Sequence, residues 1–89
     1  MKICSFTVTA ANGLHARPCA HLSSAIRNFQ SEVILEFNGQ NYNASNPISL
    51  MSANIACNDT ITFRISGEDE EQIAVAIENI LKEIGRAHV

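Results

Sequence analysis

The stretch EVILEFNGQNYN, residues 32–43, carries the clearest fold signal in this chain. Apolar side chains recur at every second position before the turn, which is typical of a strand with one buried face. The pair Asn38-Gly39 then favours a type I′ turn, because both central residues of that turn need positive φ. We therefore predict a β-hairpin whose return strand is short and covers about residues 40–44.

Two further segments, residues 3–9 and 60–66, show the same alternation of apolar and polar side chains. Each alternation predicts a strand that buries one face and exposes the other. The residues expected on the buried faces are Cys4, Phe6, Val8, Ile61, Phe63 and Ile65.

Three segments show helical signals instead. Apolar spacing predicts helices over about residues 17–29 and 69–84, and Gly85 suits a stop after the last one. Asn46-Pro47 reads as an N-cap followed by a first-turn proline, so a short helix should run to about Ala53. The apolar stripes of the two longer helices are Leu22, Ala25, Ile26 and Phe29, and Ile73, Ile77, Ile80, Leu81 and Ile84.

The predicted order is therefore βαββαβα. Strands with one apolar face indicate a sheet covered on one side, and three helices can supply that cover. We expect an α+β open-faced β-sandwich, with residues 1–89 forming a single domain.

Composition excludes several classes of function. The 89 residues carry a small formal net charge of −3, so no strongly charged surface for nucleic acid or a membrane is implied. No apolar run approaches the roughly 18 residues of a membrane helix, and the N-terminus lacks the pattern of a signal peptide. We expect a cytoplasmic protein without membrane insertion. Cys4, Cys19 and Cys57 lack metal-site spacing and are interpreted as reduced thiols, with a pairing of Cys19 with His15 as a remote alternative.

The function signal is the hexapeptide GLHARP, residues 13–18. Pro18 suits the first position of a helix, because its missing N–H would have no intrahelical partner there. The free N–H groups and the dipole of such a helix start favour bound anions, phosphate above all. His15 on this edge is a candidate to carry a phosphoryl group, and Arg17 offers a planar fork of donors to its oxygens.

The hexapeptide resembles the active-site loop of HPr, the histidine-containing phosphocarrier family of the phosphoenolpyruvate-dependent sugar phosphotransferase system. The resemblance covers essentially the whole chain, including the hairpin at Asn38-Gly39, Leu50-Met51-Ser52 and the acidic start of the last helix. It implies four antiparallel strands with three helices on one face. It also implies that His15 takes a phosphoryl group from enzyme I and passes it to enzyme IIA components.

The resemblance assigns the site residues. His15 and Arg17 would carry the chemistry, and the residues expected to stabilise the phosphoryl group are Gly13, Ala16, Arg17 and Pro18. An apolar docking patch beside the histidine would include Ala20, Pro47, Ile48 and Met51. The alternative is that Ile48 and Met51 are core residues, and because they share a helix face, a split between core and patch is also possible. No cofactor or metal is expected, and a monomer is the natural state of such a carrier.

Asn46 departs from the family. Many relatives carry a serine at this position that an ATP-dependent kinase phosphorylates, whereas Asn46 has no hydroxyl. We therefore expect no regulatory serine here and no control by that kinase.

Two other functions remain open. An HPr-like regulatory module, serving a nitrogen-related branch or binding transcription regulators, would need the same His15 and Arg17, with the phosphoryl group as a charge switch. A ligand-binding or metal-binding domain of similar plan would leave the His-Ala-Arg-Pro arrangement unexplained.

Overall fold

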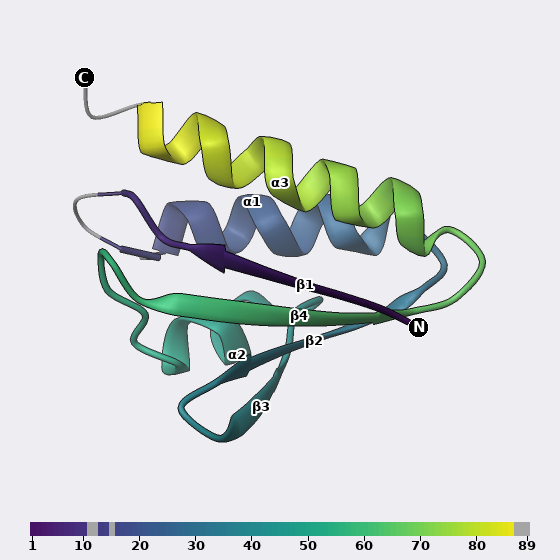
Figure 1. The fold of residues 1–89 in the computed structure, drawn as a ribbon, viewed down its shortest axis with the longest axis horizontal. Coiled ribbons are helices and arrows are strands. Elements are labelled where there is room, and N and C mark those ends of the chain that lie inside the picture. The colour runs from purple at the N-terminus through teal and green to yellow at the C-terminus, as the bar shows by residue number, and fades with distance from the viewer. Residues whose placement is uncertain (11–12, 15, 87–89) are drawn as a thin grey trace.

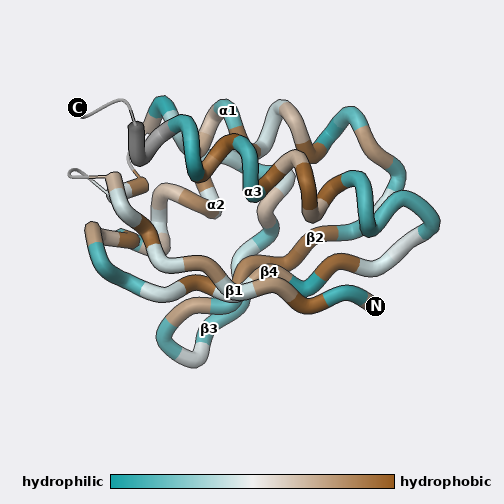
Figure 2. Tube along the Cα trace, turned by 45° about the horizontal axis from the view of Figure 1, so that its top comes forward, coloured by the Kyte–Doolittle hydropathy of each residue, from teal (hydrophilic) through white to brown (hydrophobic). Residues whose placement is uncertain are grey.

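The fold is an open-faced sandwich, seen in a computed structural model that describes residues 1–10, 13–14 and 16–86. Its four strands form one antiparallel sheet in the order β1-β4-β2-β3. The helices all lie on one side of this sheet (Figures 1 and 2). The predicted order βαββαβα is confirmed, and the elements are β1 (Lys2–Thr7), α1 (Ala16–Arg27), β2 (Glu32–Phe37), β3 (Gln40–Asn43), α2 (Pro47–Ser52), β4 (Thr60–Ser66) and α3 (Glu70–Arg86).

The hairpin between β2 and β3 forms as predicted. Asn38 and Gly39 take φ values of 53° and 77°, as a type I′ turn requires. Its register pairs Phe37 with Gln40 directly across the turn. The hairpin therefore occupies the β3 edge of the sheet, while β4 pairs with the other side of β2.

The core lies between the sheet and the helices. Side chains from the central strands β2 and β4 meet those of α1 and α3, and hydrophobic residues recur along both layers (Figure 2). Burying this apolar surface is the main drive for folding. Ten of the residues that are at most 3% exposed are Leu22, Ile26, Val33, Leu35, Leu50, Ile61, Phe63, Ile65, Ile73 and Ile77.

The opposite face of the sheet is covered by none of the described helices and carries mostly polar side chains, with Ile3 exposed among them. The hydroxyls of Ser5 and Thr62 lie 2.9 Å apart across β1 and β4. Farther along, Arg64 and Glu36 form an ion pair of 3.6 Å. Such cross-strand polar pairs let this face remain in water.

Several predicted boundaries are wrong by a few residues. α1 begins at Ala16 and ends at Arg27, so Pro18 is its third residue and not its first. The chain leaves β1 after Thr7, since Val8 bonds to the turn before β4 instead. At the other end, α3 continues through Gly85 to Arg86. Glycine in a helix costs only about 1 kcal/mol, which packing of the helix can outweigh.

None of the described helices is long and apolar enough to cross a membrane.

Asp69 joins the start of α3 to the turn between α1 and β2. Its carboxylate accepts the backbone N–H groups of Gln30 at 2.8 Å and Ser31 at 3.0 Å, and also the Ser31 hydroxyl. The N–H of Gln30 is the first cause that lowers the pKa of Asp69, with the Ser31 hydroxyl next. The ionised carboxylate therefore joins the start of α3 to the turn between α1 and β2.

We predict that Asp69→Asn lowers the melting temperature at pH 7. Because the pKa of Asp69 is lowered in the folded state, its stabilisation is present above the unfolded value of about 3.9. It is lost as pH falls through the lowered folded pKa, so wild type and variant should converge in strong acid. Thermal unfolding followed by circular dichroism across this pH range checks the effect, with Glu68→Gln as the exposed control. A difference that persists unchanged at the lowest pH would contradict it.

Candidate functional site

The loop that carries the hexapeptide is fixed by backbone bonds to the connection between α2 and β4. Val8 N–H donates to the carbonyl of Asp59 at 2.9 Å, and Asn58 N–H donates to that of Val8 at 2.7 Å. Leu14 N–H donates to the Ile55 carbonyl at 3.0 Å. These bonds bring two distant segments together at the end of the molecule where α1 begins (Figure 1).

Gly13 makes the close approach possible. Its φ is +67°, and a Cβ there would lie 2.2 Å from the Ile55 carbonyl oxygen and 2.8 Å from the Cα of Ala56. The positive φ gives the chain a tight bend here, and the missing side chain makes room for the backbone of Ile55 and Ala56. Since Gly13 N–H donates to the Ala10 carbonyl at 2.9 Å, Gly13 shapes the loop and has no N–H free for a phosphoryl group.

The N-terminal turn of α1 presents the residues expected to bind phosphate. Ala16 and Arg17 are exposed, and Pro18 is buried. The first N–H groups of any helix lack intrahelical partners and point out of its N-terminus. Arg17 forms no ion pair with any other residue that the structure describes. His15 lies outside the described residues, so its role stays a prediction.

Cys19 is a structural residue of this turn. Pro18 has no N–H to donate to the Leu14 carbonyl, and the Cys19 thiol donates to that carbonyl instead, at 3.5 Å. Cys19 is 0% exposed, and its burial raises the pKa of the thiol. A protonated thiol bound to the backbone is a poor nucleophile, which argues against the alternative pairing of Cys19 with His15.

The predicted docking residues lie on exposed surfaces. Ile48 is 71% exposed and Met51 36%, whereas Leu50 between them is buried in the core. A place in the core for Ile48 and Met51 is therefore wrong. Ala20 on α1 is exposed, Pro47 is half-buried, and α1 packs against α2.

Asn46 caps α2 as predicted. Its side-chain oxygen accepts the N–H of Ile48 at 3.0 Å and that of Ser49 at 3.5 Å. Ser45 lies outside the cap, where its hydroxyl donates to the Asn43 side chain at 2.7 Å. The amide at this position therefore performs the structural task of a capping residue.

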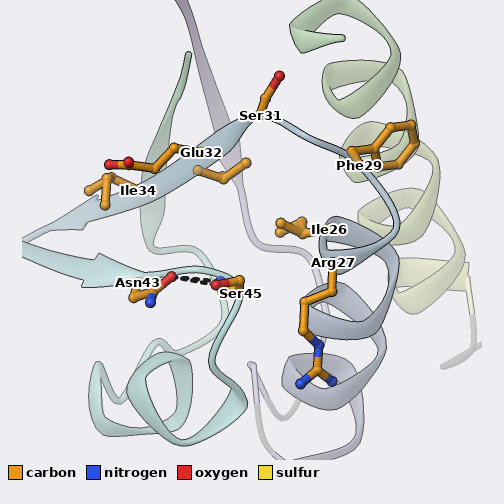
Figure 3. A pocket seen from close by; sticks show the side chains of 9 residues that line it. Ile26, Arg27, Phe29, Ser31, Glu32, Ile34, Asn43 and Ser45 are labelled. Carbon is orange, nitrogen blue, oxygen red and sulfur yellow. Dashed lines mark hydrogen bonds between the residues drawn. The ribbon is translucent and has the colours of Figure 1, made fainter. Parts of the chain in front are cut away.

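A hollow of about 520 Å³ lies at the other end of α1 (Figure 3). Ile26 and Val33 contribute to its apolar wall, and Arg27 and Glu32 point to different sides of its opening. None of the predicted site residues that the structure describes lines this hollow. Among the residues that the structure describes, no group of three or more His, Cys, Asp or Glu side chains is placed to hold a metal ion.

Comparison with known proteins decides the family. The family model described as "PTS HPr component phosphorylation site" matches residues 3–83. The chain belongs to the HPr family. Of the hexapeptide, Gly13 and Leu14 are held by the described backbone bonds, and Arg17 lies in the first turn of α1.

Solved HPr structures share the fold. HPr-C-His from Thermoanaerobacter tengcongensis is 25% identical, with 96% of each chain covered and a TM-score of 0.89. The histidine-containing phosphocarrier protein of Mycoplasma is 26% identical, with 94% of this chain and 96% of that chain covered and a TM-score of 0.90. Crh, the catabolite repression protein of Bacillus subtilis, is 30% identical, with 89% and 91% covered and a TM-score of 0.74.

The sequence did not predict the segment at Ile55 and Ala56 that contacts Gly13 and Leu14. Asn54 and Asn58 take left-handed backbone conformations with φ values of 54° and 76°, and they flank the segment that receives Gly13 and Leu14. Asparagine tolerates this region better than most residues, so these two residues were the available signal. Their partner, Gly13, is more than 40 residues away in the sequence, which no local pattern can indicate.

We predict that Gly13→Ala destabilises the fold by about 3 kcal/mol, because a left-handed φ and a clash with backbone atoms both act against it. Gly39→Ala is the matched control: Gly39 also has positive φ, at 77°, but no atom lies within 4 Å of its added Cβ. That variant should lose only about 1 kcal/mol. Urea unfolding measures both, and equal losses would show that the clash does not exist.

Proposed function

We propose that this chain is a phosphocarrier that accepts a phosphoryl group on His15 from phospho-enzyme I and passes it to enzyme IIA components. The match of the family model for the HPr phosphorylation site carries the proposal. The local chemistry supports it, because His15 immediately precedes a helix whose first turn holds an exposed arginine and no acidic residue.

The transfer needs a neutral imidazole. A ring nitrogen of His15 attacks the phosphorus held on a histidine of enzyme I. The new N–P bond forms while the donor's N–P bond breaks and its electron pair returns to the donor ring. The helix N-terminus disfavours the imidazolium before transfer and favours the negative phosphoryl group after it. In the second transfer, a histidine of enzyme IIA attacks the phosphorus held on His15. The N–P bond of His15 then breaks, and its electron pair returns to the His15 ring.

Arg17 and the start of α1 stabilise the charge in transit. The guanidinium meets the equatorial oxygens of the phosphoryl group with two parallel N–H donors. The backbone around Ala16 and Pro18 provides the anion-binding helix end, and Gly13 supports it by fixing the loop. Catalysis in such a carrier is positioning plus electrostatics, so it needs neither a cofactor nor a substrate pocket.

Docking uses the exposed residues beside this turn. Ile48 and Met51 supply apolar contact area, with Ala20 and Pro47 at its border. Methionine adapts to differently shaped partners, which suits a carrier that meets both enzyme I and enzyme IIA. Each encounter is brief, so small interfaces are expected.

The second candidate is a regulatory module on the same fold. The similarity to Crh, a protein of catabolite repression, favours keeping it. Genes for enzyme II sugar permeases beside this one would favour sugar transport, and their absence would favour regulation. A cytoplasmic monomer of one domain stays our expectation for either role, although the Crh structure is described as a domain-swapped dimer. Asn46 leaves no hydroxyl for the regulatory kinase of the family.

We predict one added phosphoryl group when the protein is mixed with phosphoenolpyruvate and a purified bacterial enzyme I. Intact mass before and after mild acid measures it, because phosphohistidine is lost in acid. His15→Ala should show no added mass while keeping its circular dichroism spectrum. Phosphorylation of this variant would refute His15 as the acceptor. If wild type gains no mass from an enzyme I that is active on another HPr, the regulatory role replaces the carrier.

Arg17→Lys should slow the transfer about tenfold, since an ammonium keeps the charge but cannot form the two-pronged contact. Rapid-quench measurement of the second-order rate with phospho-enzyme I checks this effect. Arg27→Lys, at the far end of the same helix, is the matched control and should react at the wild-type rate. Equal rates for both variants would remove Arg17 from the chemistry.

A further inference from the structure

The end of α2 is set by a residue with left-handed backbone conformation. Asn54 directly follows the C-cap residue Ala53, and its φ is 54°. The Asn54 N–H donates to the Met51 carbonyl at 3.2 Å, as expected of a left-handed residue that ends a helix. The chain therefore leaves the helix axis at Asn54, and the next residue, Ile55, is buried with 4% exposure.

A second left-handed residue shapes the turn before β4. The Asp59 N–H donates to the Ala56 carbonyl at 3.1 Å, which closes a four-residue turn. Asn58 is the third residue of this turn and has a φ of 76°, and a type II turn needs a positive φ at that position. The Asp59 carboxylate also accepts the Ala56 N–H at 2.8 Å. The backbone of residues 56–59 is thus held by the turn and by this carboxylate.

The two asparagines bound the segment that contacts the hexapeptide loop. Between them, the Ile55 carbonyl accepts the Leu14 N–H at 3.0 Å. The Asn58 N–H donates to the Val8 carbonyl at 2.7 Å, and the Asp59 carbonyl accepts the Val8 N–H at 2.9 Å. All three bonds join backbone groups, so their directions depend on the φ values of the two asparagines.

The side chains of Asn54 and Asn58 matter for the backbone conformation that they permit. Both residues are exposed. Asparagine enters the left-handed region more readily than most residues, and glycine enters it freely. In alanine, the Cβ lies too close to the following carbonyl oxygen in this conformation. Substitution by alanine at either position therefore acts mainly on the backbone.

We infer that Asn54 and Asn58 are positioning residues for the proposed phosphoryl transfer, because their left-handed conformations place the Ile55 carbonyl and the turn that hold the loop before α1. This inference rests on the proposed function. His15 follows Leu14 directly in the chain, so the segment that holds Leu14 governs how the imidazole meets the phosphorus. A displacement of about 1 Å in a reacting group can slow a reaction by about a hundredfold.

The first test places alanine at three left-handed asparagines, at a temperature where every variant is folded. Asn54→Ala and Asn58→Ala should each lower the maximum rate of transfer from saturating phospho-enzyme I at least about fivefold. The donor concentration for half-maximal rate should change less than about twofold, because binding is not what is lost. Asn38→Ala is the matched control, since Asn38 has a similar φ of 53° but lies in the hairpin turn between β2 and β3. That variant should lose comparable stability and react at the wild-type rate.

Glycine variants separate the backbone conformation from other effects of substitution. Asn54→Gly and Asn58→Gly should transfer within about twofold of the wild-type rate, because glycine takes a positive φ without a clash. Slow glycine variants, wild-type rates for both alanine variants, or equal slowing by Asn38→Ala would each overturn the inference while the phosphocarrier function stands. If the wild-type protein accepts nothing from a donor active on another HPr, the proposed function is refuted, and the inference with it.

Amide hydrogen exchange tests the placement of the loop without any donor. The measured quantity is the exchange rate of the Leu14 N–H divided by that of Phe63, a buried residue of β4. This ratio should rise at least about tenfold in Asn54→Ala and Asn58→Ala, because the loop then opens locally more often. It should keep its wild-type value in Asn38→Ala. An unchanged ratio in the first two variants would overturn the inference, whatever their rates of transfer.

Discussion

The packing of Gly13 and Leu14 against Ile55 and Ala56 is the contact on which the site depends. A Cβ at Gly13 would lie 2.2 Å from the Ile55 carbonyl, which itself accepts the N–H of Leu14. This contact sets where α1 begins relative to the connection after α2. Without it, the helix N-terminus and the exposed apolar side chains of α2 would not share one surface.

The same contact fixes the helix start on which the proposed phosphoryl transfer depends. A helix N-terminus attracts anions only where its free N–H groups face the ligand, so the loop before it must hold a fixed path. Two further backbone bonds, between Val8 and the turn before β4, brace that loop from its other side. Cys19 completes the arrangement by occupying the carbonyl that Pro18 leaves without a donor.

Features set by neighbouring residues could be predicted from the sequence, and features set by distant ones could not. The turn at Asn38-Gly39 and the cap at Asn46 are local, because each depends on residues within about one turn. The insertion of β4 between β1 and β2 depends on long-range pairing, and its topology came from the family resemblance. The stop expected at Gly85 is wrong, since glycine disfavours a helix by only about 1 kcal/mol.

In the candidate site, too, some features could be predicted from the sequence and others could not. Residue types in the hexapeptide make His15 a candidate for phosphoryl chemistry, and the resemblance to the HPr family turns that candidate into a prediction. The exposure of Ile48 and Met51 needed the fold, since three-residue spacing fits a core face equally well.

Amide hydrogen exchange at Leu14 tests most directly whether the loop is held in place. Its N–H is buried in a bond to the Ile55 carbonyl, so it should exchange as slowly as amides in the core strand β4, such as that of Phe63. Exchange of Leu14 as fast as that of an exposed turn residue would mean that the loop opens freely. The helix start and the exposed side chains of Ile48 and Met51 would then not form a preorganised site.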